Sequence, residues 1–204
     1  MPSGKGSPDR LVFFSDAVVA IAITLLILPL TEAVPAALEH HLSAPELISE
    51  NAGKIYSFLL SFVVIARLWG LHHHLFEQVK AYSRPLLYAN LAWLLSIVAL
   101  PFPTEITSLY PAGQFEAALY IGTIFASSLC QAAMVLVIRG DPDLREADSD
   151  PVTRPLFDIL LTTGTLALAF AVAALVPGAG YYPLLLLLVP PMLDRIRRAR
   201  TTAT

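Results

Sequence analysis

The chain has 204 residues, of which 56% are hydrophobic and only 14% are charged. Soluble domains carry about 25% charged residues, so this composition excludes an ordinary soluble domain. The mean hydropathy of +0.66 indicates a protein embedded in a membrane. The net charge of −3 excludes little by itself, because in a membrane protein the information lies in how the charges are distributed among the loops.

Apolar segments recur along the chain without a long polar insert, which predicts a single all-α membrane domain over residues 1–204. A bilayer core about 30 Å thick needs about 20 apolar residues in a helix. The predicted transmembrane helices are six: about 11–30, 55–76, 86–109, 115–138, 156–176 and 180–193. We expect the ends, about 1–8 and 199–204, to be disordered.

Prolines and one aspartate mark the boundaries of these helices. Pro29 is expected to close the first helix, and the polar loop after it to hold a short interfacial helix. The aspartate in the first apolar run favours a transmembrane helix over a cleaved signal sequence. The two prolines of "LPFPT", which begins at Leu100, should end or kink the third helix. The sixth helix is short and rich in proline.

The basic residues predict the topology, because cytoplasmic loops are enriched in Lys and Arg. With six helices, only Lys54 lies on the side opposite the termini, and Arg67 lies inside the second helix. The other eleven of the 13 basic residues fall on the side of the termini: Lys5, Arg10, Lys80, Arg84, Arg139, Arg145, Arg154, Arg195, Arg197, Arg198 and Arg200. This asymmetry predicts that both termini are cytoplasmic in the cell membrane.

Hydrogen-bonding groups lie at one depth in the first three predicted helices. They are Ser15, Asp16, Arg67, Trp69, His72 and Asn90. Such groups are costly in a bilayer unless they are partnered, so they indicate either an interhelical packing network or a proton or ion pathway. We favour packing, because a pathway should continue across the membrane and the other half offers only Glu105.

The run His72-His73-His74 raises the question of a metal site. Consecutive helical residues point in different directions, and no cysteine accompanies the run. We therefore expect no structural metal. One of the three histidines should join the polar network, and the others should lie near the cytoplasmic interface.

The aliphatic residues of the first helix form a continuous stripe. At 100° per residue, Ala17, Thr24, Leu25 and Leu28 lie within about 60° of Ile21, whereas Asp16 lies about 140° away. The acidic residue therefore faces other neighbours than the stripe does. Periodicity alone leaves open whether the stripe faces lipid, a packed core or a pore.

The motif "RLVFFSD", from Arg10 to Asp16, resembles the first helix of the transmembrane protein 175 family of endolysosomal potassium channels and their prokaryotic relatives. The sequence "WGLHH" from Trp69, Asn90 and "LPFPT" are also similar to that family's pattern. The resemblance runs through the first three helices. The last three agree mainly in number and hydropathy.

The resemblance implies a homotetramer, because prokaryotic members carry one six-helix copy per chain. It also implies that the first helix lines the pore, with a hydrophobic constriction at Ile21 and further layers at Leu25 and Leu28. Ala17 and Thr24 would line the pore, and Thr24 corresponds to a threonine that animal members use to favour potassium. The resemblance further implies a network of side chains that braces the first helix against the next two. Its members would be Arg10, Phe14, Ser15, Asp16, Trp69, His72 and Asn90.

The expected function is a potassium-permeable cation channel with modest selectivity for K⁺ over Na⁺. The sequence contains no Thr-Val-Gly-Tyr-Gly segment, so a carbonyl filter is not expected, and a ring of isoleucines would block ions by dewetting. We expect no cofactor, enzymatic activity or nucleic-acid partner. The expected partners are other copies of the chain, the bilayer and monovalent cations.

Three other functions remain open. A proton-coupled secondary transporter would use Asp16, Arg67 and His72, and an intramembrane metalloenzyme would use His72–His74. A purely structural membrane protein would show no flux. The acidic residues of the first external loop would concentrate cations at the channel mouth or would simply be solvated.

Overall fold

The computed structural model describes residues 7–110, 113–145 and 153–188, and every regular element in these ranges is helical. The α-helices are α1 (Asp9–Leu25), α2 (Leu28–Glu39), α3 (Ala44–Glu50), α4 (Ala52–Phe76), α5 (Arg84–Ala99), α6 (Pro101–Leu109), α7 (Gln114–Gly140) and α8 (Thr153–Leu175). Two 3₁₀ helices follow α7 and α8: η1 (Pro142–Leu144) and η2 (Tyr182–Leu188). Within these described ranges, four helical segments are long and apolar enough to cross a bilayer: Asp9–Glu39, Ala52–Phe76, Arg84–Leu109 and Gln114–Gly140.

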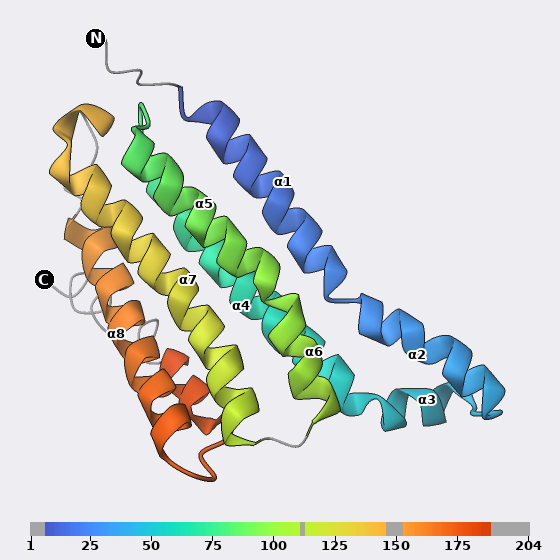
Figure 1. The fold of residues 1–204 in the computed structure, drawn as a ribbon. Coiled ribbons are helices and arrows are strands. Elements are labelled where there is room, and N and C mark those ends of the chain that lie inside the picture. The colour runs from blue at the N-terminus through green and yellow to red at the C-terminus, as the bar shows by residue number, and fades with distance from the viewer. Residues whose placement is uncertain (1–6, 111–112, 146–152, 189–204) are drawn as a thin grey trace, which may run out of the picture.

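The first helical segment continues beyond the predicted end at Pro29. α1 ends at Leu25 and, after a short turn, α2 begins at Leu28. Pro29 therefore opens a helix and does not close one, because a proline in the first turn lacks only an N–H that has no intrahelical partner. α2 and α3 project away from the other helices and return to the start of α4 (Figure 1).

The third predicted helix is divided in two, as the prolines of "LPFPT" indicate. Leu100 separates α5 from α6, and Pro101 and Pro103 lie in the first turn of α6. Because the prolines cannot donate to the preceding turn, the regular hydrogen-bond ladder is interrupted there. α6 continues in nearly the same direction as α5 (Figure 1).

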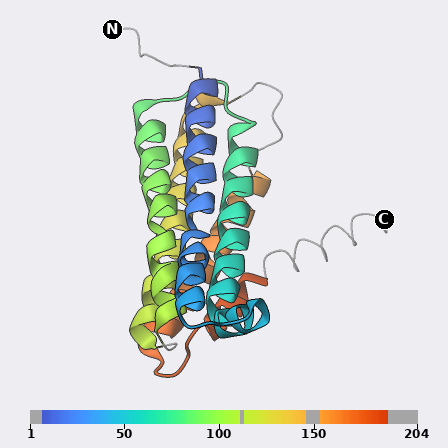
Figure 2. The ribbon, with the colours of Figure 1, turned by 90° about the vertical axis from the view of Figure 1, so that its right-hand side faces the viewer.

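α7 lies at the centre of the bundle and packs against α5 and α8. Half of its most apolar stretch is buried, compared with 28% for the first helical segment. α1 packs on α4 and α5 with one face only (Figure 2). At one end of the bundle, the Lys80 N–H donates to the carbonyl of Leu144 over 2.9 Å, which ties the α4–α5 loop to η1.

The last predicted helix, about 180–193, is a 3₁₀ helix over Tyr182–Leu188 in the described part of the chain. Residues 189–193 and the predicted disordered ends, apart from residues 7 and 8, lie outside the described residues. The fifth predicted helix corresponds to α8. The number of six transmembrane helices therefore stays a prediction.

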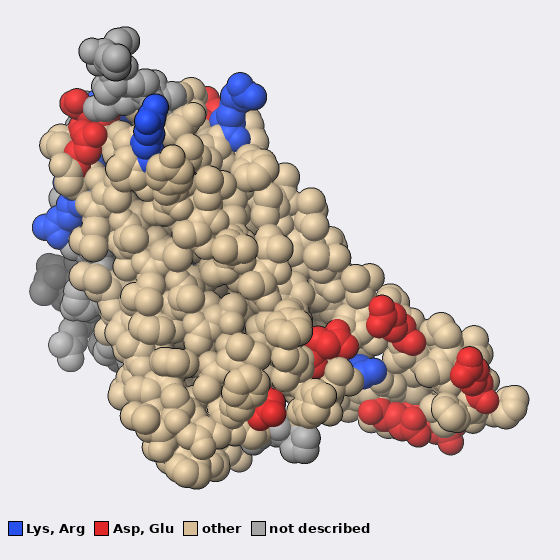
Figure 3. Space-filling model, viewed as in Figure 1, with Lys and Arg blue, Asp and Glu red and all other residues tan. Residues whose placement is uncertain are grey.

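Charged side chains are distributed unevenly between the two ends of the bundle. In Figure 3 the visible Lys and Arg side chains gather toward the end that holds the start of α1, with one exception near α2. Acidic side chains dominate the projecting α2 and α3. This distribution agrees with the one on which the predicted topology rests, although the side of the membrane on which each end lies stays a prediction.

Candidate functional site

A buried chain of hydrogen bonds connects α1, α4 and α5. The Asn90 side-chain amide donates to Ser15 Oγ over 2.9 Å, and Ser15 Oγ donates to the carbonyl of Leu11 over 2.8 Å. His72 Nε2 lies 2.7 Å from Asn90 Oδ1, so the imidazole donates to the amide oxygen. Ser15, His72 and Asn90 are all fully buried. The three helices are therefore joined by polar groups that lipid cannot satisfy.

Aromatic rings fix the orientation of the buried histidine. The His72 ring stacks on Trp93 with centroids 4.0 Å apart and planes inclined by 7°, and on Phe76 at 4.5 Å. Sequence analysis did not single out Trp93. Its position three residues after Asn90, which places both residues on the same face of α5, could have indicated that it lies beside the polar network.

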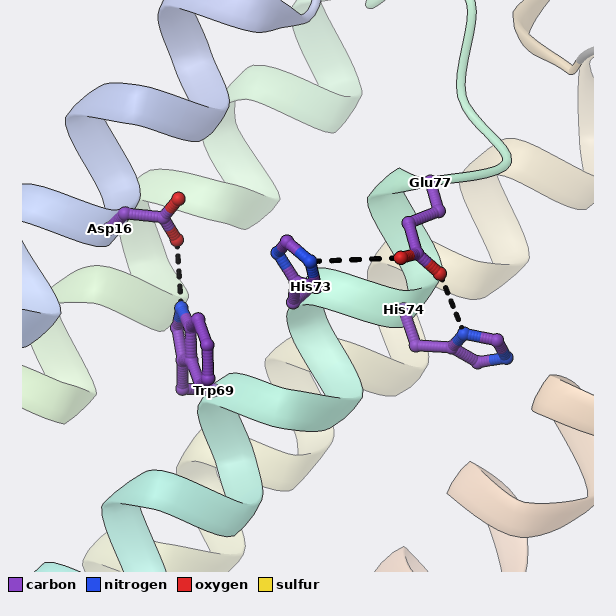
Figure 4. A network of polar contacts seen from close by, with 5 residues as sticks. All are labelled: Asp16, Trp69, His73, His74 and Glu77. Carbon is purple, nitrogen blue, oxygen red and sulfur yellow. Dashed lines mark hydrogen bonds and ion pairs between the residues drawn. The ribbon is translucent and has the colours of Figure 1, made fainter.

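A second polar contact joins α1 to α4 nearer the surface. The indole N–H of Trp69 donates to Asp16 Oδ1 over 2.8 Å, as Figure 4 shows. Asp16 is half-buried, and Trp69 is 37% exposed. Because a carboxylate accepts a stronger hydrogen bond than a neutral oxygen does, this contact holds the start of α1 against α4.

His73 and His74 lie outside the buried network. His73 Nε2 is 3.7 Å from the Glu77 carboxylate, and His74 Nδ1 is 2.9 Å from it (Figure 4). All three side chains are about half-exposed or more. In the described ranges no group of three or more His, Cys, Asp or Glu side chains is arranged to hold a metal ion.

Two motif residues lie apart from the network. The Arg10 side chain is exposed and makes no hydrogen bond or ion pair with another described residue, and Phe14 is 52% exposed. Arg67 is half-buried on α4, the helix that also carries Trp69 and His72. A bracing role for Arg10 and Phe14 stays a prediction.

The predicted stripe runs from Ala17 on α1 to Leu28, the first residue of α2, and is exposed along its whole length. The exposed fractions are 59% for Ile21, 39% for Leu25 and 47% for Leu28, and Ala17 and Thr24 are also exposed. The Thr24 hydroxyl donates to the carbonyl of Ile21 over 2.8 Å, so its oxygen lone pairs stay available on the same face. The buried residues of α1 lie on the other side: Leu11, Ser15, Val19 and Ala22.

A second buried polar cluster, which sequence analysis missed, lies toward the other end of the bundle. Ser61 Oγ is 2.8 Å from Thr104 Oγ1 and 2.9 Å from the Tyr120 hydroxyl. It joins α4, α6 and α7, and all three residues are buried. Hydroxyl groups in apolar helices were the available signal, but their positions in sequence do not reveal which of them meet.

Residues 10–101 match the model of a protein family described as the endosomal/lysosomal potassium channel TMEM175. This range contains the exposed stripe and the whole Ser15–Asn90–His72 chain. A protein of Streptomyces collinus named a potassium channel is 34% identical over 132 residues, which cover 61% of each chain. A protein of Chryseobacterium sp. that is also named a potassium channel is 29% identical over 89% of this chain and 92% of its own length.

A TMEM175 protein of Danio rerio, named an endosomal/lysosomal proton channel, is 27% identical over 66% of this chain. The matched region is only 25% of that protein and less than two thirds of the Streptomyces protein. The fold is similar to the crystal structure of a lysosomal potassium-selective channel TMEM175 homolog from Chamaesiphon minutus, with a TM-score of 0.74 and 24% identity over 93% of this chain and 96% of that one. Together these matches confirm the resemblance that the "RLVFFSD" motif indicated.

Proposed function

We propose that this chain is a member of the TMEM175 family and a subunit of a potassium-permeable cation channel in the cell membrane. Four copies would surround a central pore lined by α1. The observation that carries the proposal is the contrast between the faces of α1. Hydrogen bonds hold one face to the bundle, whereas the face with Ile21 and Leu25, which Leu28 of α2 continues, is exposed. The potassium-channel names of the bacterial relatives support the choice of ion.

The exposed stripe has the chemistry of a hydrophobic constriction. Apart from the Thr24 hydroxyl it offers no polar side chain, so four Ile21 side chains around an axis would exclude water when close together. Wider spacing would admit a largely hydrated cation. Such a pore has no cage of carbonyl oxygens to replace the hydration shell, so we expect only modest preference for K⁺ over Na⁺.

The polar network has a mechanical role in this proposal. A pore wall must stay in place as its constriction widens and narrows, and α1 packs on its own bundle with one face only. The Ser15–Asn90 and Asp16–Trp69 hydrogen bonds would hold the start of α1, leaving the part after Ala22 to move at the turn before α2. No structural metal or cofactor has a part in this mechanism.

Replacement of Ile21 by Asn tests the proposal. In liposomes loaded with K⁺ we expect Ile21→Asn to raise the flux or to reduce the preference for K⁺ over Na⁺, because a polar ring retains water. The matched control is Leu95→Asn on α5, where the native side chain is 71% exposed. If both variants behave alike, or if neither changes flux and selectivity, the stripe does not line the pore.

The oligomeric state is tested separately. We expect the purified protein to have the mass of four chains after subtraction of the bound detergent. A stable monomer or dimer that still conducts K⁺ would contradict the arrangement around α1.

The names of the animal relatives favour proton permeation as a second candidate function. A pH-sensitive dye in the same liposomes measures it directly. The remaining alternative is a proton-coupled transporter using Asp16, Arg67 and His72. It predicts saturable flux driven by a pH gradient and abolished by Asp16→Asn, whereas the channel predicts flux that rises with the K⁺ gradient.

A further inference from the structure

A cavity of about 330 Å³ lies where α1 and α2 diverge from the bundle. One wall is formed by the turn between α1 and α2, including Leu25 and Leu28, and the facing wall by α4 and α6. Most of the lining is apolar, with Phe102 from α6 opposite the turn. The buried hydroxyl of Thr104 lies on the same α6 wall and connects the cavity to the Ser61–Tyr120 cluster.

Three charged side chains line the same cavity: Glu32 of α2, Lys54 of α4 and Glu105 of α6. Figure 3 shows acidic and basic atoms side by side in the hollow between the bundle and the projecting α2. In the described part of the chain, no ion pair within 4.0 Å joins Lys54 to Glu32 or Glu105. The cavity therefore presents separate positive and negative groups above an apolar wall.

The depth of the cavity matches that of lipid headgroups. Lys54 is the third residue of α4, and Glu105 lies just over one turn before the end of the membrane-length segment Arg84–Leu109, so both charges are near the ends of such segments. Charged side chains near helix ends reach toward the polar interface, while the apolar wall extends toward the acyl chains. This lining is complementary to an amphipathic ligand that carries charges of both signs.

The geometry points to a binding site for a phosphoethanolamine lipid. Lys54 would bind the phosphate, Glu32 and Glu105 would accept hydrogen bonds from the primary ammonium group, and the start of an acyl chain would lie on Leu26, Phe58 and Phe102. A phosphocholine headgroup has no N–H to donate, and phosphatidylglycerol has no cationic group. Small-molecule cavities start at about 300 Å³, so the volume suits a headgroup and the first part of a chain.

The site would affect conduction through the turn between α1 and α2. Its ligand would touch helix ends on both sides of this turn, and Leu25 and Leu28 are predicted constriction residues. A lipid that binds one arrangement of this turn better than another shifts the population toward that arrangement. This consequence rests on the proposed channel function, whereas lipid binding itself does not.

Native mass spectrometry of the purified full-length protein tests binding. With phosphatidylethanolamine, phosphatidylcholine and phosphatidylglycerol of identical chains, we expect preferential retention of phosphatidylethanolamine. Glu105→Gln and Lys54→Gln should each weaken this retention about tenfold, because a hydrogen bond to a charged group contributes at least about 1.5 kcal/mol. The matched control Glu39→Gln removes a charge from α2 outside the cavity lining and should leave retention unchanged.

A neutral variant protects the test against misfolding. Ser108→Phe fills the cavity from α6 without changing a charge, and it should reduce retention in protein that elutes and melts like wild type. Equal retention of the three lipids, or equal loss in Glu39→Gln, would overturn the site. K⁺ flux in phosphatidylcholine liposomes with and without phosphatidylethanolamine then tests the effect on conduction. Absence of flux in both kinds of liposome contradicts the channel function. Equal flux in both, together with equal retention of the three lipids in the mass spectra, contradicts only the lipid site.

Discussion

The two faces of α1 are made largely of aliphatic residues, yet they have different surroundings. The inner face carries Ser15 between buried apolar neighbours and is joined to α5 through Asn90. The outer face carries Ile21 and Leu25, which the rest of the chain leaves exposed. The comparison teaches that hydrophobicity places a helix in the membrane, whereas a few polar contacts decide which face is held and which is left for other partners.

Removal of the aromatic support of the inner face should have the largest effect. Trp93 is fully buried and stacks on His72. We expect Trp93→Ala to lower the stability by about 3 kcal/mol or more, because it opens a cavity and frees the imidazole. Thermal unfolding in detergent measures the loss. The control Leu95→Ala, at an exposed position on the same helix, should change the melting temperature little; equal losses would mean that Trp93 does not support the network.

Replacement of Asn90 breaks the chain of hydrogen bonds itself. Asn90→Leu leaves the Ser15 and His72 polar groups buried without this partner, so we expect a loss of about 2 kcal/mol. Ser96→Ala is the control, since among the described residues the Ser96 hydroxyl donates only to the Trp93 carbonyl of its own helix. A melting temperature of Asn90→Leu equal to that of Ser96→Ala would show that the inner face is not held by these bonds.

The Asp16–Trp69 contact should contribute less, because Trp69 is partly exposed. Trp69→Phe keeps the ring and removes only the indole N–H donor, and we expect a loss of about 1 kcal/mol. The double-mutant cycle with Asp16→Asn isolates the contact. Additive losses in that cycle would mean that the hydrogen bond does not hold the start of α1.

The smallest expected effect lies on α3, away from both faces of α1. The Glu46 carboxylate accepts hydrogen bonds from the hydroxyl and the backbone N–H of Ser43, which lower the pKa of Glu46. The stabilisation is present above the unfolded pKa of about 4.3 and is lost as the pH falls through the lower folded value. A small difference between wild type and Ser43→Ala at pH 7 should therefore vanish in acid. Circular dichroism measures it, with Ser49→Ala as control; a difference that persists in acid would contradict this origin.

The inner face could be predicted from the sequence because polar residues in apolar helices are few. Ser15, His72 and Asn90 stood out for that reason, and the structure brings them together. Trp93 did not stand out, since an aromatic residue in a membrane helix is common and its stacking depends on the relative rotation of α4 and α5. The start of α2 at Leu28 was missed, because a proline is found both just after the end of a helix and in the first turn of the next one. The residue type alone does not distinguish these two positions.

For the outer face, the sequence predicts which residues lie together but not what they contact. The helical period places Ile21, Leu25 and Leu28 together, but a period does not reveal whether lipid, a packed helix or a pore lies against such a face. The same limit applies to the number of helices. The apolar segment from residue 180 onward is short and contains prolines. Its sequence therefore does not decide between a membrane-spanning helix and a shorter element, because that outcome depends on packing.

The position of Ile21 in the assembled protein tests the central claim most directly. It can be measured by determining the structure of the purified assembly in a lipid nanodisc. We predict four-fold symmetry with the Ile21 side chains around the axis and the Asp16–Trp69 contacts behind them. An assembly in which Ile21 faces lipid, or in which α1 lies away from the symmetry axis, would contradict the account.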